Sequence, residues 1–372
     1  MSIIKKAVGL IVNPIAGMGG RVGLKGTDGR ETLQKAVTLG ATPQAPSRAE
    51  MFLTELKPVV DHVRLVVGAG WMGESETKEC GFEFKVVGER KDETFAEDTR
   101  EAARMIKEEG VELLVFCGGD GTARDVLDAV QETIPVLGVP TGVKMHSGVF
   151  AVSPGSAAVI VVRFLFEGLP LREMEVMDVD EVAFRNERLS ARLYGYVLTP
   201  YEPGFIQSSK IASPATEDEL HNQAAIGVYM IEEMESDVVY IMGPGTTTRT
   251  ITDLLDEKKT LLGVDILLNK KITARDVNEE GILRAIKSRK AKIVVTPIGG
   301  QGFIFGRGNQ QISSRVIKAV GLENIIVVAT KDKLKDLKTL RVDTGDALLD
   351  KELKGYRKVI TDYKEEHVVS VE

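Results

Sequence analysis

Short apolar runs alternate with amphipathic stretches along the first half of the chain. The apolar runs predict β-strands at residues 7–12, 63–67, 82–87, 111–117 and 134–139. The amphipathic stretches predict helices at 30–39, 47–57 and 94–109. A further helix is predicted to begin directly after the strand at 111–117, and another to begin at Ser153-Pro154. The run at 111–117 is apolar at nearly every position, which is typical of a strand buried on both faces of a parallel sheet. This alternation predicts a parallel sheet with right-handed helical crossovers.

The pattern changes near Leu171, where residues 171–200 alternate between apolar and polar as half-buried antiparallel strands do. Short strands then follow at 237–242, 262–268, 292–296 and 324–329, with a helix at 217–234. We therefore predict an α/β protein with an N-terminal parallel-sheet nucleotide-binding domain over residues 1–169. A second, substrate domain with an antiparallel β component is predicted over 170–345. For residues 346–372 we consider a return to the first domain.

Charge and composition narrow the range of partners. The chain has 372 residues with 48 Lys plus Arg against 55 Asp plus Glu, a formal net charge of −7. An acidic chain is a poor general binder of nucleic acid or anionic membranes, because phosphate contacts need a basic face. Its 2 cysteines and 4 histidines are too few for a disulfide framework or a ligand-rich zinc site. No apolar run reaches the roughly 18 residues of a membrane span, and no export signal is evident. These features predict a cytoplasmic protein that binds neither nucleic acid nor a membrane.

The strongest chemical signal is the turn Gly118-Gly119-Asp120-Gly121-Thr122, which joins the apolar strand to a helix. Glycines let the backbone turn sharply and approach a ligand closely. The free N–H groups and positive end of the following helix suit phosphate. Because a carboxylate repels phosphate, Asp120 needs another role, such as accepting a proton from an alcohol or handling magnesium. The alternative is a plain strand–helix turn with Asp120 as its N-cap.

Four motifs that occur in family order, together with the loop after the first strand, support a family resemblance. The GGDGT turn resembles that of the NAD kinases, diacylglycerol and sphingosine kinases and 6-phosphofructokinases. Asn13-Pro14 and residues 16–20, after the first strand, resemble the nucleotide loop of the lipid-kinase and ATP-NAD kinase branches. With residues 138–154, 243–249 and 299–311, the chain most resembles the ATP-NAD kinase/AcoX-type family of polyphosphate- or ATP-dependent NAD kinases.

This resemblance implies a kinase that transfers a phosphoryl group from ATP or polyphosphate to the 2′-hydroxyl of NAD, giving NADP. Asp120 would be the general base, Mg²⁺ would bridge the donor phosphates, and the enzyme would be a homo-oligomer. No side chain is assigned as a metal ligand. The resemblance implies nucleotide or phosphate contacts from Asn13, Gly17, Gly118, Gly119, Gly121, Thr122, Gly245, Thr246 and Thr247. Family members also have an Asn-Glu pair in the second domain, but the surroundings of Asn186-Glu187 match that pair poorly.

Other binding candidates come from the residues themselves. A polar loop follows the strand at 134–139, at the edge where open α/β sheets bind ligands. It contributes Thr141, Gly142, Lys144 and His146 as candidates. Arg249 is placed to pair with a phosphate. An ordinary surface loop and a helix-capping turn are the alternatives. We assign no role to the loop at 299–309 or to the insertion at 20–29.

Three other functional hypotheses are consistent with these motifs. Because GGDGT is shared across the superfamily, the acceptor alcohol is alternatively a lipid, a sphingoid base or a small polyol. A non-catalytic nucleotide sensor would keep the fold without the chemistry, and the intact Asp120 argues against it. A role known only through association with a catabolic operon is a third possibility, since the AcoX label records such an association.

Overall fold

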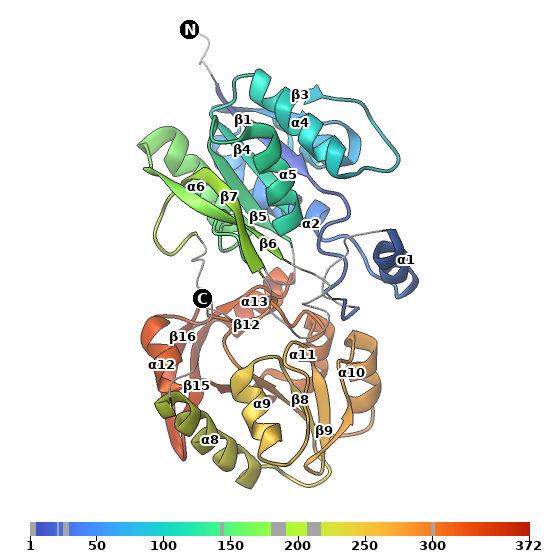
Figure 1. The fold of residues 1–372 in the computed structure, drawn as a ribbon, viewed down its shortest axis with the longest axis vertical. Coiled ribbons are helices and arrows are strands. Elements are labelled where there is room, and N and C mark those ends of the chain that lie inside the picture. The colour runs from blue at the N-terminus through green and yellow to red at the C-terminus, as the bar shows by residue number, and fades with distance from the viewer. Residues whose placement is uncertain are drawn as a thin grey trace. The chain divides into compact units, whose positions relative to one another are not determined.

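The computed structural model describes residues 5–20, 22–24, 30–141, 145–179, 191–206, 217–298 and 302–372. The chain divides into two compact units, each described here by itself (Figure 1). Unit 1 comprises Met1–Met18 and Gly26–Ser209, and unit 2 comprises Gly19–Lys25 and Lys210–Glu372. Gly19 and Gly20, which follow β1 (Lys6–Val12) in the chain, therefore group with unit 2.

Unit 1 contains a five-stranded, all-parallel sheet in the order β3-β2-β1-β4-β5. Its strands are β1 (Lys6–Val12), β2 (Val63–Gly68), β3 (Glu83–Val87), β4 (Leu113–Gly118) and β5 (Val136–Pro140). Every residue of β4 is buried, as its continuous apolar run predicts. The structure confirms the predicted parallel-sheet domain. The register pairs Val12 with Cys117, so the loops after β1 and β4 begin side by side.

Helices cover both faces of this sheet. Side chains of α2 (Ala45–Leu56) and α6 (Pro154–Glu167) pack into the core on one face. Those of α4 (Ala96–Glu108) and α5 (Asp120–Val130) pack into the core on the other. The remaining elements between β1 and β3 are α1 (Arg30–Thr38), α3 (Glu74–Cys80), η1 (Lys57–Val59) and η2 (Gly70–Met72). Because α2 and α5 lie on opposite faces, the sheet has a topological switch point between β1 and β4, where such folds bind ligands.

An antiparallel hairpin completes unit 1 and moves the predicted domain boundary. Strands β6 (Leu171–Val179) and β7 (Ala191–Pro200) pair over their length, as the alternating pattern predicts. Val176 and Val197 are buried in the core that contains α5, so the hairpin belongs to unit 1. The boundary that we expected after residue 169 therefore differs from the structure, in which unit 1 extends to Ser209.

Unit 2 is built on a seven-stranded mixed sheet in the order β10-β9-β8-β11-β13-β15-β16. Strands β8 (Val239–Met242), β11 (Ala291–Val295), β13 (Ile325–Val328) and β15 (Gly355–Asp362) are parallel. Strands β9 (Asp265–Leu268), β10 (Lys271–Ala274) and β16 (Glu365–Val371) add antiparallel pairs. A separate pair joins β12 (Phe303–Phe305) to β14 (Arg341–Val342). The antiparallel component predicted for the second domain is thus confirmed.

Helices also cover both faces of the second sheet. On one face α8 (Glu217–Glu232) lies beside α9 (Thr246–Asp253), as Figure 1 shows in olive and yellow. Side chains of α10 (Glu279–Ile286), α11 (Ser314–Val320) and α13 (Ala347–Leu353) pack into the core on the other face. The short elements α12 (Lys331–Asp336) and η4 (Leu322–Asn324) complete the unit.

The C-terminal residues differ from our expectation. Residues 346–372, for which we considered a return to the first domain, form α13, β15 and β16 within unit 2. Val327 of β13 pairs with Val359 of β15, and both are buried in the core of that unit. The β-branched residues near the C-terminus are therefore strand residues of the second sheet.

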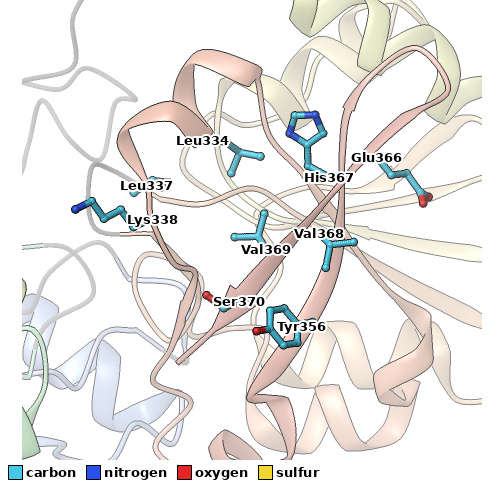
Figure 2. A pocket seen from close by; sticks show the side chains of 9 residues that line it. All are labelled: Leu334, Leu337, Lys338, Tyr356, Glu366, His367, Val368, Val369 and Ser370. Carbon is cyan, nitrogen blue, oxygen red and sulfur yellow. The ribbon is translucent and has the colours of Figure 1, made fainter.

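The last strand leaves an open groove along the sheet edge (Figure 2). Its lining consists of Leu334, Leu337, Lys338, Tyr356, Glu366, His367, Val368, Val369 and Ser370. Glu366 forms an ion pair with Lys358 at 2.8 Å, so charges lie at the edge of the sheet. Charged side chains on an edge strand disfavour the addition of a strand from another chain. No helix in the described part of the chain is long and apolar enough to cross a membrane.

Candidate active site

The carboxyl edge of the unit 1 sheet brings three predicted segments together. The Asn13 N–H donates to the Cys117 carbonyl at 3.0 Å, and the Thr141 N–H donates to the Gly118 carbonyl at 3.2 Å. Gly17 has φ +79, and a Cβ there would lie 2.2 Å from the Thr141 carbonyl oxygen. Only glycine allows this close approach between the loops after β1 and β5.

Thr122 fixes the glycine turn from inside. Its side chain is buried, and its hydroxyl accepts a hydrogen bond from the Asn13 side-chain amide at 3.0 Å. A Cβ on Gly118 would lie 2.4 Å from that hydroxyl, so glycine is required there by packing. By contrast, a Cβ on Gly119 would meet no atom within 4 Å. The space beside Gly119 is therefore free for a ligand.

Asp120 is the first residue of α5, and its carboxylate is held by the loop that follows β5. Oδ2 accepts from the His146 N–H at 2.9 Å, and Oδ1 accepts from the Ser147 N–H at 2.9 Å. The Ser147 hydroxyl also donates to Oδ1, at 2.5 Å. That hydroxyl in turn accepts from the Met177 N–H of β6 at 2.9 Å. The carboxylate is thus fixed in one orientation by two segments that lie far apart in the sequence.

Opposing effects set the basicity of Asp120. Burial raises its pKa above the usual value for an aspartate. The Ser147 hydroxyl, the backbone N–H groups of His146 and Ser147, and the positive charge of Arg124 oppose this rise. The result is a carboxylate that is more basic than an exposed aspartate. A carboxylate of raised pKa is a better proton acceptor near neutral pH.

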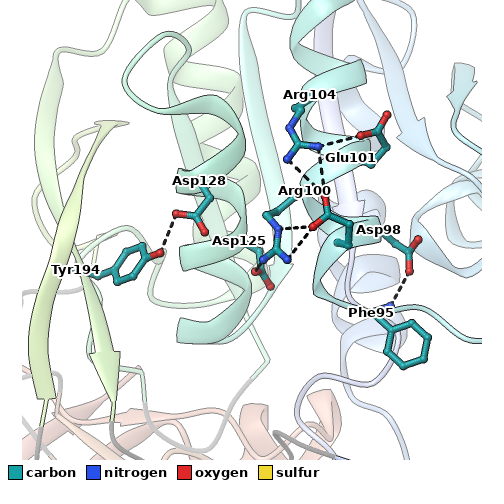
Figure 3. Close-up of polar contacts among 9 residues, drawn as sticks. Phe95, Asp98, Arg100, Glu101, Arg104, Asp125, Asp128 and Tyr194 are labelled. Atoms are coloured by element: carbon teal, nitrogen blue, oxygen red, sulfur yellow. Dashed lines mark hydrogen bonds and ion pairs between the residues drawn. The ribbon is translucent and has the colours of Figure 1, made fainter.

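Ion pairs hold α5, the helix that carries Asp120, against its neighbours (Figure 3). The Arg100 guanidinium of α4 contacts both Glu97 and Asp125, the latter at 2.5 Å. On the other side of α5, the Tyr194 hydroxyl of β7 donates to Asp128 at 2.8 Å. Arg124 also pairs with Asp178 of β6. These contacts limit rotation of the helix and keep its first residue in place.

Two family models match the chain, and together they cover most of it. The model of the ATP-NAD kinase N-terminal domain matches residues 8–168, and that of the C-terminal domain matches residues 235–371. The chain belongs to the NAD kinase family. It is therefore a kinase, a phosphotransferase with an alcohol acceptor. No curated protein matches the chain.

Kinases of this family generally use ATP and a divalent metal such as Mg²⁺. Among the residues that the structure describes, no group of three or more His, Cys, Asp or Glu side chains is placed to hold a metal ion. Mg²⁺ in phosphoryl-transfer sites is bound by one or two carboxylates together with substrate phosphates and waters. Among the described residues, Asp120 Oδ2 accepts a hydrogen bond from the His146 N–H. The site therefore fits an ion that donor phosphates and waters hold, and Asp120 remains the proposed proton acceptor.

The other predicted binding residues fall into three groups. The His146 backbone N–H binds Asp120, a contact that the sequence did not predict. Gly142 and Lys144 lie outside the described residues, as do Asn186-Glu187. Gly245, Thr246, Thr247 and Arg249 belong to unit 2, where Arg249 pairs with Asp253 on its own helix at 3.5 Å.

Sequence reasoning missed Ser147, which orients the predicted base. Ser147 follows His146 directly, but a serine in a polar loop carries no signal of its own. Its role depends on the position of β6, whose Met177 N–H binds the same hydroxyl. A serine hydroxyl both donates and accepts, so one residue fixes both partners.

Removing the Ser147 hydroxyl should change the pH dependence of turnover. Ser147→Ala deletes a hydrogen bond to the ionised form of Asp120, so the pKa of Asp120, already raised, should rise further. The base must be ionised to act, so the acidic limb of kcat/KM should move to higher pH, by about one unit. Ser153→Ala, which removes the N-cap of α6, is the control. A limb that stays in place in Ser147→Ala, or that moves equally in both variants, would contradict this role.

Proposed function

We propose that this kinase transfers a phosphoryl group from ATP or polyphosphate to the 2′-hydroxyl of the adenosine ribose of NAD, giving NADP. The observation that carries the proposal is the placement of Asp120. Its carboxylate is held by two N–H groups and a hydroxyl, at the N-terminus of α5 and next to the free space beside Gly119. A fixed, basic carboxylate next to a phosphate-binding turn is suited to deprotonating an alcohol that attacks a phosphoryl group.

The proposed reaction uses Asp120 as general base. The 2′-oxygen attacks the terminal phosphorus, its proton passes to the Asp120 carboxylate, and the bond from phosphorus to the leaving oxygen breaks. N–H groups of the first turn of α5 stabilise the charge on the transferred group. Mg²⁺, when bound with the donor, neutralises charge on the donor phosphates. The remaining positions proposed to contact the nucleotide are Asn13, Gly17, Gly118, Gly119, Gly121, Thr122, Thr141, Gly142, Lys144, His146, Gly245, Thr246, Thr247 and Arg249.

Thr141 supports a ligand at this edge independently of Asp120. Its side chain is buried, and its hydroxyl has no hydrogen-bond partner among the described residues. A buried hydroxyl left without a partner costs about 1–3 kcal/mol. A phosphate oxygen or a ribose hydroxyl at the β4–β5 edge would satisfy it.

Two adjacent glycines give a matched pair of variants. A Cβ on Gly119 meets no atom, so Gly119→Ala should keep its thermal stability but lose at least about tenfold in kcat/KM, because the methyl group fills the space of the ligand. A Cβ on Gly118 would clash with Thr122, so Gly118→Ala should lower the melting temperature. Calorimetry and initial rates on both variants make the comparison. Full activity in a stable Gly119→Ala protein would contradict a ligand at this turn.

Turnover with a matrix of donors and acceptors tests the function itself. ATP and polyphosphate are each offered with NAD in the presence of Mg²⁺, and NADP is measured. NADP formation with at least one donor is the expected result. If small polyols or lipid alcohols are phosphorylated and NAD is not, the acceptor assignment is wrong. The homo-oligomeric state and the cytoplasmic location stay predictions. Light scattering during gel filtration would test the oligomeric state.

A further inference from the structure

The only tryptophan of the chain is exposed at the edge of the sheet that carries Asp120. Trp71 lies in η2, the short turn after the carboxyl end of β2, and is 60% exposed. Its neighbours Ala69 and Met72 are buried, and Met72 packs into the core of unit 1. An exposed indole ring forgoes the hydrophobic stabilisation that burial would give. Its place at the ligand-binding edge makes it a candidate for a contact with a bound molecule.

Hydrogen bonds hold the turn around this ring in one conformation. The Gly70 N–H donates to Glu74 Oε2 at 2.9 Å, and the Ser75 hydroxyl donates to the Gly70 carbonyl at 3.1 Å. Glu74 Oε2 also accepts from Arg90 Nε at 2.9 Å. Gly70 has φ +60, a conformation that glycine adopts without strain. The tryptophan ring is thus presented from a fixed backbone, so a ligand that binds it orders little of the chain.

The charges beside the ring are compatible with an anionic ligand. Glu74 is buried and forms ion pairs with both Arg90 and Lys78, the latter at 2.8 Å. Both cations are exposed, with 66% and 52% of their side chains accessible. The carboxylate of this turn is therefore neutralised by two exposed cations, and a ligand that carries phosphates is not repelled by it.

The order of the strands places the ring next to the loop after β1. In the order β3-β2-β1-β4-β5, the turns after β2 and β4 lie on either side of the loop that begins at Asn13. A Cβ on Gly73 would lie 3.2 Å from the Leu10 carbonyl oxygen, so the turn after β2 packs directly against β1. Neighbouring strands are about 4.8 Å apart, so the strands that lead to Trp71 and Asp120 are separated by about 10 Å.

This separation distinguishes the base of the donor from the adenine of the acceptor. In the proposed reaction the 2′-hydroxyl of the acceptor lies at Asp120, and the adenine is attached to the neighbouring ribose carbon. The acceptor adenine therefore stays close to Asp120. The base of ATP is separated from the transferred phosphoryl group by two phosphates and a ribose, so it is long enough to reach the turn after β2.

We propose that Trp71 stacks on the adenine of ATP and thereby makes ATP the favoured phosphoryl donor. The proposal rests on the proposed function and adds the identity of the donor to it. Stacking of one base on an aromatic side chain is worth about tenfold or more in affinity. Polyphosphate has no base and gains nothing from the ring.

The fluorescence of Trp71 reports this contact directly, because the chain has no other tryptophan. ATP with Mg²⁺, titrated into the full chain without an acceptor, should quench the emission until the site is saturated. Tripolyphosphate should leave the emission of the free protein unchanged and should reverse the quenching by ATP, because it competes for the phosphate-binding turn. Equal quenching by tripolyphosphate and ATP would overturn the stacking. Quenching by NAD and not by ATP would place the nicotinamide at the ring and overturn the donor assignment.

Removal of the ring gives the second test. Trp71→Ala should keep its melting temperature, because the ring is exposed, and should bind ATP about tenfold more weakly in calorimetric titrations. Its affinity for tripolyphosphate should equal that of the wild type. Trp71→Phe keeps an aromatic ring and should lose less affinity for ATP than Trp71→Ala.

Phe166→Ala is the matched control for the loss of an exposed ring. Phe166 is 46% exposed in the last turn of α6 and lies edge-on against His62, which precedes β2, at the opposite edge of the sheet. This variant should bind ATP as the wild type does. Equal ATP affinities of Trp71→Ala and Phe166→Ala would overturn the proposal. The titrations need no acceptor, so quenching by ATP in a protein that forms no NADP would reject the acceptor and leave the contact with Trp71 standing.

Discussion

Asp120→Asn is expected to lower kcat for NADP formation by about 10²–10⁴-fold, the range that a general base contributes. Asparagine cannot accept the proton of the attacking hydroxyl. It keeps one carbonyl oxygen to accept from Ser147, but its NH₂ group then faces the His146 N–H. We therefore expect a modest loss of stability, about 1–3 kcal/mol, beside the loss of rate.

Measurements of NAD binding and of thermal stability separate the loss of rate from the loss of stability. NAD titrated into Asp120→Asn should bind within a few-fold of wild type, because the carboxylate is assigned to proton transfer and not to the grip on the dinucleotide. Thermal melts of the same samples show that the protein is folded at the assay temperature. A folded variant that keeps more than about a tenth of the wild-type kcat would contradict the assignment of Asp120 as the base.

Glu76→Gln is expected to stabilise unit 1 at alkaline pH, because Glu76 is a buried carboxyl group. It lies in α3, is 3% exposed, and its Oε2 has no hydrogen-bond partner among the described residues. Burial raises its pKa from 4.5 to about 7, and the charges of Glu50 and Glu79 add to the rise. Because its folded pKa exceeds the unfolded one, the contribution of Glu76 to the free energy of unfolding is greatest below pH 4.5 and is lost as pH rises to about 7. The shift corresponds to roughly 3 kcal/mol, lost above pH 7.

Glutamine resembles the protonated acid, so it should remove this pH dependence. Glu76→Gln should match the wild type near pH 4 and exceed its unfolding free energy by roughly 3 kcal/mol near pH 8.5. Trp71, the only tryptophan of the chain, lies in η2 just before α3 and reports unfolding of unit 1 by fluorescence. Glu108→Gln, at an exposed position of α4, is the control. Equal stabilities of wild type and Glu76→Gln at both pH values would show that the carboxyl group is not desolvated.

The sequence predicted the first sheet and its catalytic turn because both signals are local. Continuous apolar runs mark strands that are buried on both faces, and Gly118-Gly119-Asp120 lies directly after one of them. The signal for the start of α6 is equally local, because Ser153 caps the helix by accepting a hydrogen bond from the Ser156 N–H, as its position before Pro154 predicts. Helices without such a cap were placed less well, as α2 begins at Ala45 and not at residue 47.

The features that the sequence missed depend on tertiary contacts. The alternating pattern of 171–200 predicted a hairpin, but only its packing shows that Val176 and Val197 belong to the core of unit 1. Ser147 acquires its role from Asp120 and Met177, which lie 27 and 30 residues away in the chain. Trp71 likewise became notable only when the fold left its ring exposed at the edge of the sheet.

The central claim is that Asp120 activates the 2′-hydroxyl of NAD. The most direct measurement identifies the product of wild-type turnover, by ³¹P NMR and chromatography against authentic NADP, with ATP or polyphosphate as donor, NAD as acceptor and Mg²⁺ present. Asp120→Asn is run in parallel. The account predicts NADP phosphorylated at the 2′ position, formed by the wild type and nearly lost in the variant. Phosphorylation of a different alcohol, or NADP formed equally by both proteins, would contradict it.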